Sequence, residues 1–419
     1  MNIWLINHYA VPPKYYPLAR QTYFAKYLMQ MGHTVTIFAA STVHNSDKNL
    51  ITGKERWREE TVDGVHYVYI KCLDYRDNGP RRIYNICEFA WKLPGVCGKF
   101  PRPDAIVATS MPPTSCAVGI HLARKYKCRA VAEIADLWPE SIVAFGIAGP
   151  RNPAVIALRW LEKWIYKKAD AVVFTLEGAY DYIAEQGWEK DVPRSKVFYI
   201  NNGVDLESFD HDRAAFPAED PDLNDPDTFK LVYTGSIRKA NGLSQLLDCA
   251  ERLRDHPDIR FLVYGAGDDL EPLREACRER GLSNLCFKGP VAKKEVPGIL
   301  SKSDVNLLNY DPGSMAVYRF GNSQNKLFEY LASGKPVLTN VRISYNPADR
   351  RRCGLAAASP DGKDYAEAVL KLYRLPREEY EEMCRAARET AEEYDFKKLT
   401  KMLLDVIEGR RPGGYYVGN

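Results

Sequence analysis

The sequence predicts an α/β protein of two doubly wound domains, and three observations support this. Short apolar segments alternate with longer amphipathic segments along most of the chain, which is typical of βαβ units around a parallel sheet. The alternation stops between Leu206 and Phe229 and then starts again. The chain has 419 residues, enough for two domains of ordinary size.

The first half of the chain carries six predicted strands and three predicted helices. The strands are short apolar runs at residues 2–7, 33–40, 104–109, 129–134, 170–175 and 196–200. The helices have apolar residues at helical spacing and cover residues 20–31, 114–126 and 154–168. These elements form the first predicted domain, residues 1–205.

The second half repeats this pattern after a break. Residues 206–229 contain two Asp-Pro-Asp triplets and no hydrophobic period, so we expect a linker. The next predicted strands are 230–235, 259–265, 285–289, 304–309 and 336–340. The helices between and after them are 242–254, 269–280, 294–302 and a largely helical stretch from 363 to 408. We expect a second domain over 230–395, a C-terminal helix over 396–419 that crosses back to the first domain, and a ligand cleft between the domains.

Composition favours a protein of the reducing cytoplasm. Hydrophobic residues make up 45% and charged residues 27% of the chain, as in soluble globular proteins. The formal net charge of +3 combines an excess of basic residues before residue 206 with an excess of acidic ones after it, so we expect an anionic partner for the first half only. The ten cysteines form no Cys-x-x-Cys pair, which argues against zinc and redox motifs. We see no signal peptide and no apolar run of spanning length.

The stretch NSQNKLFEYLASGKPVL at 322–338 combines features of an anion site. Asn322 or Ser323 is a candidate N-cap, and Gly334 fits the left-handed position after a helix end. Lys326 and Glu329 share one face near the helix N-terminus, where free amides favour a phosphate and a carboxylate can accept from sugar hydroxyls. The alternative is an ordinary surface ion pair between these two side chains.

Loops after three neighbouring predicted strands carry related chemistry. Thr234-Gly235-Ser236 is followed by Arg238 and Lys239, Gly265 and Gly267 follow the next strand, and residues 289–291 follow the third. Glycine lets the backbone approach a phosphate, and basic side chains offset its charge. Each loop alone is a weak signal, and their combination with the helix at 322–338 is stronger.

At this point the chain resembles the retaining glycosyltransferases of the large family four, which have the GT-B fold of two Rossmann-like domains. The resemblance rests on MGHTVTIFAAS, NGVDLESF, VYTGSIRKANGL, VYGAGDDLEPLR, FKGPVAKKEVPGIL and NKLFEYLASGKPVL, which occur in order along the chain. EIADLWPESIV at 133–143 is similar to the subgroup of N-acetyl-L-fucosamine transferases of bacterial surface-polysaccharide assembly.

The resemblance implies a nucleotide-sugar site in the second domain. Glu329 matches the second Glu of the family's Glu-x7-Glu motif, which holds the ribose, while Gly321 replaces the first. Asn325 and Lys326 are assigned to the donor diphosphate. Ser236 and Asn241 stand where the family has the Arg and Lys that grip the diphosphate. Arg238, Lys239 or Lys326 is expected to supply that charge instead, with Arg238 and Lys326 counted as catalytic. The remaining donor-binding candidates are Gly235, Gly265 and Val291.

The first domain departs further from the family. NHYAVPPKYYPLARQ lacks the usual Gly-Gly after the first strand, so Arg20, His8 and Tyr9 are the acceptor-side candidates there. The family's His-Asp reads Ala135-Asp136 here, which leaves Asp136 as a catalytic and Glu140 as an acceptor-side candidate. Structural roles remain open for His8, Asp136 and Glu140.

The resemblance implies transfer of a sugar, N-acetylated or deoxy, from a UDP-sugar to a polyprenyl-diphosphate-linked or oligosaccharide acceptor, as in O-antigen or capsule assembly. Charge would develop on the departing β-phosphate, which fixed donors stabilise, and no enzymic nucleophile, cofactor or metal is expected. Asp220-Pro-Asp222 and Asp225-Pro-Asp227 lie in the predicted linker and are not expected to bind a metal. The alternatives are a UDP-sugar epimerase of the same fold and a catalytically silent nucleotide-sugar-binding subunit.

Residues 81–100 interleave basic and aromatic residues with apolar residues at helical spacing. We expect either an amphipathic helix packed on the first domain or a peripheral contact with the inner face of the cell membrane. We expect no nucleic-acid partner.

Overall fold

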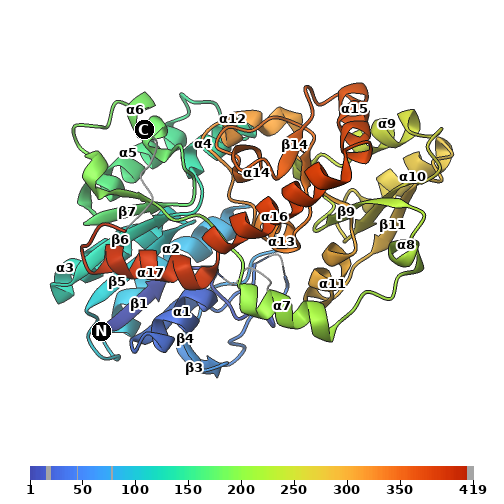
Figure 1. Ribbon diagram of the computed structural model, residues 1–419. Coiled ribbons are helices and arrows are strands. Elements are labelled where there is room, and N and C mark those ends of the chain that lie inside the picture. The colour runs from blue at the N-terminus through green and yellow to red at the C-terminus, as the bar shows by residue number, and fades with distance from the viewer. Residues whose placement is uncertain (16–19, 45, 77–78, 413–419) are drawn as a thin grey trace. The chain divides into compact units, whose positions relative to one another are not determined.

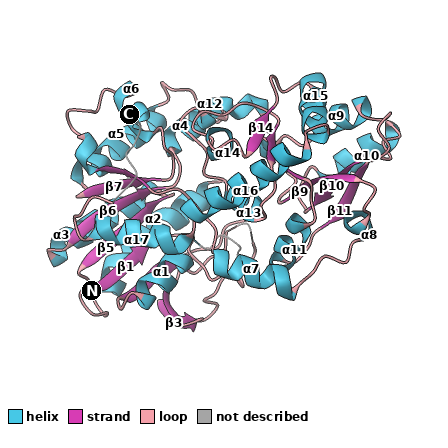
Figure 2. Ribbon diagram, viewed as in Figure 1, coloured by secondary structure: helices cyan, strands magenta, loops and turns pink. Residues whose placement is uncertain are grey.

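The computed structural model describes residues 1–15, 20–44, 46–76 and 79–412, and the chain divides into two compact units. Unit 1 comprises Met1–Asn201 together with the chain from Phe396 onward, and unit 2 comprises Asn202–Asp395. Each unit has a central sheet with helices packed on it (Figures 1 and 2). The predicted α/β architecture of two doubly wound domains is confirmed.

The sheet of unit 1 has eight strands in the order β3-β4-β2-β1-β5-β6-β7-β8. All neighbouring strands are parallel except β3 and β4, which form an antiparallel pair. The strands are β1 (Asn2–Ile6), β2 (Thr34–Ala40), β3 (Trp57–Val62), β4 (Val65–Ile70), β5 (Ala105–Ser110), β6 (Arg129–Ile134), β7 (Ala171–Phe174) and β8 (Val197–Tyr199).

The helices of unit 1 form two layers. α1 (Arg20–Gln30) and α17 (Phe396–Ile407) pack on each other, and α3 (Pro113–Tyr126) contacts both α2 (Pro80–Cys97) and α5 (Pro153–Lys168). Right-handed crossovers put α1 on one face of the sheet and α2, α3 and α5 on the other. The short helices are α4 (Trp138–Ala144) and α6 (Ala179–Glu185). Within the described residues, no helix combines the length and hydropathy needed to cross a lipid bilayer.

The sheet of unit 2 has six parallel strands in the order β11-β10-β9-β12-β13-β14. These are β9 (Phe229–Thr234), β10 (Ile259–Tyr264), β11 (Leu285–Gly289), β12 (Val305–Leu308), β13 (Val337–Thr339) and β14 (Gly354–Ala356). The helices are α7 (Leu206–Ala215), α8 (Pro221–Asn224), α9 (Gln245–Arg252), α10 (Leu270–Glu279), α11 (Val296–Ser301), α12 (Met315–Tyr318), α13 (Asn325–Ala332), α14 (Pro347–Arg350), α15 (Gly362–Tyr373) and α16 (Arg377–Glu393).

Several parts of the chain differ from the predicted elements, among them the short helices α4, α6, α12 and α14, which were not predicted. Residues 206–229 are not a structureless linker, because α7 packs on α11 and α8 is capped by the Asp220 carboxylate, which accepts from the amide of Asp222. The β3–β4 hairpin and β14 were not predicted. β3 is largely exposed, so it lacks the apolar run that marks a buried strand.

A buried ion pair joins α1 to β6, and the same arginine also bonds to the chain just before unit 2 begins. The Arg20 Nε lies 2.9 Å from the Glu133 Oε1, and the two side chains are 8% and 1% exposed. The other guanidinium nitrogens donate to the carbonyl oxygens of Ile200 (2.8 Å) and Asn201 (2.5 Å). Gln21 Nε2 donates to Glu133 Oε2. This network fixes the chain where unit 1 gives way to unit 2.

We predict that Arg20→Met lowers the free energy of unfolding by about 3–5 kcal/mol, because it leaves the Glu133 carboxylate buried without its cation. Urea unfolding monitored by circular dichroism measures this. Arg377→Met is the control, because Arg377 pairs with Glu381 on an exposed helix surface and should change stability by less than about 1 kcal/mol. Equal effects of the two substitutions would contradict the structural role of Arg20.

Candidate functional site

The carboxyl ends of β9 and β10 approach each other closely in unit 2. The amide of Gly235 donates to the carbonyl oxygen of Tyr264 at 3.0 Å. Gly265 has φ +150°, and a Cβ there would lie 1.8 Å from the carbonyl oxygen of Gly235. Glycine at 265 is therefore required by contact between two backbones. Gly235 and Ser236, which follow β9, are both exposed.

Lys326, in the first turn of α13, reaches this loop. Its Nζ donates to the Tyr233 hydroxyl (2.8 Å) and to Asn241 Oδ1 (2.9 Å), and it lies 4.6 Å from the centre of the Tyr233 ring. A Cβ at residue 235 would lie 3.3 Å from Nζ, so Gly235 also leaves room for the ammonium group. The lysine is thus held at the end of β9.

The groups around the ammonium are tied together by further hydrogen bonds. The Tyr233 hydroxyl donates to the Ser236 carbonyl oxygen (2.7 Å). Asn241 Nδ2 donates to the Ser236 carbonyl oxygen (2.9 Å) and Oγ (3.1 Å). Ser236 and Asn241 are the positions where the family carries its basic residues. Lys326, which comes from a different part of the chain, places a positive charge beside both of them.

The Lys326 ammonium bonds only to uncharged groups within the described residues. Burial lowers the pKa of Lys326 to about 7, and the charge of Glu329 counteracts part of this. A cation in this position gains when an anion supplies the missing counter-charge. The arrangement is therefore suited to a phosphate group.

Glu329 lies one turn further along α13 and is 18% exposed. Its carboxylate pairs with Lys293 rather than with Lys326. The expected alternative, a surface pair between Lys326 and Glu329, is therefore wrong. Asn322 is not the N-cap, because α13 starts after Gln324 and Asn322 Oδ1 accepts from the Gln324 amide.

The other predicted donor-side residues lie in the loops after β9, β10 and β11 or at the start of α13. Arg238 and Lys239 are exposed, and their side chains form no hydrogen bond or ion pair within the described part of the chain. Asn325 opens α13, and Val291 follows β11; both are partly exposed. These positions are compatible with ligand contact and are not themselves a preformed site.

His8 and Tyr9, the acceptor-side candidates in the loop after β1, form contacts within the protein. His8 is fully buried, and its Nε2 lies 2.6 Å from Asn85 Oδ1. Burial lowers the pKa of His8 to about 3, so the ring is neutral and closed to an acceptor. The Tyr9 hydroxyl accepts from the Arg82 guanidinium at 2.8 Å. Both residues fasten α2 to the end of β1, and the expected acceptor contact of His8 is corrected.

Arg20 and Glu140 are also engaged by the protein. The guanidinium of Arg20 donates to Glu133 and to two backbone carbonyls. Arg20 therefore has a structural role, and the expected ligand contact is wrong. Glu140, in the first turn of α4, accepts from Arg159 at 2.9 Å and is 15% exposed. This geometry supports the structural alternative for Glu140.

Asp136 is the acidic candidate whose side chain remains accessible to a ligand. It follows the end of β6, is exposed, and forms no hydrogen bond or ion pair within the described ranges. Although the side chain is exposed, desolvation by the protein around it raises the pKa of its carboxyl to about 6. A carboxylate with this pKa can exchange a proton near neutral pH.

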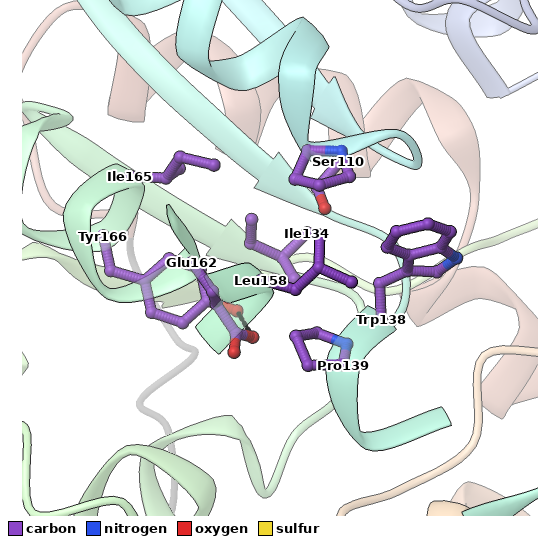
Figure 3. Close-up of a pocket in the computed structure, with 9 residues that line it drawn as sticks. Ser110, Ile134, Trp138, Pro139, Leu158, Glu162, Ile165 and Tyr166 are labelled. Carbon is purple, nitrogen blue, oxygen red and sulfur yellow. Dashed lines mark hydrogen bonds between the residues drawn. The ribbon is translucent and has the colours of Figure 1, made fainter. Parts of the chain in front are cut away.

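A small apolar pocket lies at the ends of β5 and β6 (Figure 3). Its lining residues are Ser110, Pro113, Ile134, Trp138, Pro139, Leu158, Glu162, Ile165 and Tyr166. The Glu162 carboxylate accepts from the hydroxyls of Tyr166 (2.6 Å) and Tyr182 (2.7 Å). Burial nevertheless raises the pKa of Glu162 to about 7.

The Asp-x-Asp stretches serve the fold of unit 2. Lys288 pairs with both Asp220 and Asp222, and the Tyr264 hydroxyl donates to Asp220. Asp225 accepts from the amide of Asp227. Within the described residues, no three His, Cys, Asp or Glu side chains are grouped as metal ligands. All ten cysteines are free thiols.

Sequence reasoning missed four residues that shape these clusters: Tyr233, Lys293, Glu133 and Glu162. Tyr233 and Glu133 lie inside predicted strands, where an aromatic or a single acid carries no functional signal. Lys293 lies in the stretch FKGPVAKKEVPGIL that was singled out, but nothing in that stretch identifies its partner.

Comparisons with known proteins agree with this division of the chain. Residues 19–203 match a family model described as glycosyl transferase 4-like domain, and residues 228–374 match one described as glycosyl transferases group 1. The Escherichia coli K12 protein named as colanic acid biosynthesis glycosyl transferase WcaI is 25% identical over 300 residues, covering 68% of this chain and 70% of that protein.

Two further likenesses extend the comparison. The Bacillus subtilis 168 protein named as teichuronic acid biosynthesis glycosyltransferase TuaH is 30% identical over 186 residues, 42% of each chain. A solved structure described as trehalose-6-phosphate from E. coli bound with UDP-2-fluoro glucose has a TM-score of 0.71 at 11% identity, covering 98% of this chain and 100% of that one. At this identity the likeness shows the GT-B fold.

We predict that Glu162→Gln removes a pH dependence of stability. The carboxyl keeps its proton in the folded state up to about pH 7, whereas in the unfolded chain it ionises near pH 4.5. Stability should therefore fall between these pH values and stay lower above pH 7. The difference corresponds to about 3 kcal/mol.

Thermal unfolding of both proteins at several pH values checks this. The Gln variant should gain stability over the wild type as the pH rises from 5 to 8, while Glu367→Gln, an exposed residue of α15, should behave like the wild type. Parallel curves for Glu162→Gln and the wild type would show that Glu162 is ionised in the folded protein at all these pH values.

Proposed function

We propose that this chain, a GT-B glycosyltransferase with a glycosyl transferase 4-like domain and a group 1 domain, transfers a sugar from a UDP-sugar during surface-polysaccharide assembly. The observation that carries the proposal is the Lys326 ammonium, which within the described residues bonds only to uncharged groups and lies beside an exposed, glycine-containing strand end. The names of two relatives, which refer to colanic and teichuronic acid biosynthesis, support the polysaccharide context.

In this proposal the donor occupies the carboxyl ends of the unit 2 strands. The diphosphate binds at Gly235 and Ser236, with Lys326 in place of the family's Arg and Lys. Glu329 accepts from the ribose hydroxyls, and Lys293, which pairs with it, orients the carboxylate. Arg238, Lys239, Asn241, Gly265, Val291 and Asn325 complete the proposed donor site.

Lys326 acts on the charge that develops during transfer. The bond between the sugar's anomeric carbon and the β-phosphate oxygen breaks, and a bond to the acceptor oxygen forms on the same face. The acceptor proton passes to the departing phosphate, so UDP and the glycoside are the products. A fixed cation at that phosphate stabilises the transition state, and losing one such donor costs about 3 kcal/mol.

On the acceptor side, we propose that Asp136 contacts the acceptor. Its open carboxylate and raised pKa suit a hydrogen bond to an acceptor hydroxyl. We propose a polyprenyl-diphosphate-linked or oligosaccharide acceptor, reached on the cytoplasmic face of the membrane through a peripheral contact of residues 81–100. In that segment α2 buries one face and exposes Ile83, Tyr84 and Trp91.

The experiment that tests the proposal measures UDP release from a panel of UDP-sugars, with and without short-chain lipid-diphosphate-linked sugars. Release that depends on the acceptor supports the transferase. Conversion of the UDP-sugar to an epimer without acceptor would establish the epimerase alternative, and nucleotide binding without turnover under any pairing would establish the silent subunit.

We predict that Lys326→Met lowers kcat/KM for the active pair by about 100-fold or more, mainly through kcat. Glu329→Gln should chiefly raise KM for the donor, because a ribose contact is equal in the ground and transition states. Lys363→Met, which changes an exposed lysine of α15, is the matched control and should leave both constants unchanged. Wild-type kinetics in Lys326→Met would contradict the assigned role.

A further inference from the structure

Exposed apolar side chains are concentrated on unit 1. Among the described residues, all eleven large apolar side chains that are exposed belong to this unit, and eight of them lie on α2, α5 or the segment that joins α4 to α5. These eight are Ile83, Tyr84, Trp91, Phe145, Ile147, Ile156, Trp160 and Trp164. Single exposed apolar residues are common, whereas a concentration on neighbouring helices indicates a contact surface.

On α2 and α5 the exposed residues form two stripes. Each stripe has three residues spaced by four, which lie along one side of a helix. We call them the tryptophan stripes; they consist of Ile83, Cys87 and Trp91 on α2, and of Ile156, Trp160 and Trp164 on α5. Trp91 is 80% and Trp160 is 74% exposed, so neither ring contributes to the core of unit 1.

The two stripes belong to one helical layer. α3 contacts both α2 and α5, and the Arg124 guanidinium of α3 lies 5.8 Å from the centre of the Trp164 ring on α5. Residues of α3 that point outward include Arg124 and Lys125. The outer sides of the three helices therefore form one surface, with basic residues between the two stripes.

Five basic residues of these helices, Arg81, Arg124, Lys125, Lys167 and Lys168, are exposed, whereas neither of their acidic residues is. The three helices carry nine Lys and Arg residues but only two acidic ones, Glu88 and Glu162, whose side chains are 13% and 5% exposed. Two nearby acids pair with basic residues of α5: Glu140 with Arg159, and Asp191 with two lysines. Even when both are counted, basic residues outnumber acidic ones nine to four.

We infer that the outer surface of α2, α3 and α5 binds an anionic lipid bilayer through both tryptophan stripes. Exposed tryptophan partitions to the boundary between headgroups and acyl chains, and Lys and Arg beside it are attracted to anionic headgroups. The inference extends the contact proposed for α2 to a second helix, α5, and rests on that part of the proposed function. It does not depend on the identity of the donor.

The test is co-sedimentation of the full chain with vesicles of phosphatidylcholine, with or without about one third phosphatidylglycerol. The wild type should bind the anionic vesicles and release them at high salt. Trp160→Ala/Trp164→Ala should lower the partition coefficient by about tenfold or more, although both changes lie outside residues 81–100. Trp91→Ala should lower it as well, and Arg124→Glu/Lys125→Glu should abolish the preference for phosphatidylglycerol.

Lys398→Glu/Lys401→Glu is the matched control, because it reverses two exposed charges on α17 in the opposite helical layer, and it should bind like the wild type. Circular dichroism melting verifies that each variant is folded, and turnover with a water-soluble acceptor reports the transferase separately. Binding unchanged by the α5 variant would overturn the inference. So would a dimer in sedimentation velocity that the tryptophan substitutions dissociate, because a second copy would then cover this surface.

Discussion

The parallel order of the unit 2 strands is the constraint on which the proposed donor site depends. Parallel strands bring their carboxyl ends to one edge of the sheet, so the loops after β9 and β10 meet there. Their backbones approach so closely that Gly265 has no space for a Cβ against Gly235. Gly235 and Ser236, just after β9, are exposed, and the side chain of Lys326 from α13 reaches this strand end.

We propose that Lys326 supplies, from another position in the chain, the positive charge that Ser236 and Asn241 lack. Tyr233 and Asn241 hold its ammonium by hydrogen bonds without neutralising it, and burial lowers its pKa. The amino group is therefore held in place before the donor arrives, and we propose that the donor phosphate raises its pKa and favours the charged form that stabilises a departing phosphate. In this proposal the same lysine compensates for the uncharged residues at both Ser236 and Asn241.

The sequence predicted the alternation of elements well because apolar runs and helical spacing report burial directly. It could not predict contacts between residues that are distant in the sequence and that the folded sheet brings together, such as Lys326 and Tyr233, which are 93 residues apart. That a residue follows a strand end in the sequence also does not show whether its side chain points toward a ligand or into the protein. His8 and Arg20 stand where a ligand contact was expected, yet both turn inward, to Asn85 and to Glu133. The short helix α8 was not predicted, because Asp and Pro were taken as signs of a linker, whereas here Asp220 caps the helix and Pro221 is its first residue.

Titration of Lys326 tests most directly whether its ammonium receives the donor diphosphate. Heteronuclear NMR of lysine side chains, assigned with Lys326→Arg, would follow this group with and without saturating UDP. The account predicts a pKa of about 7 in the free protein and a rise of about one unit or more with UDP. An identical pKa in both states would contradict the assignment of Lys326 to the diphosphate.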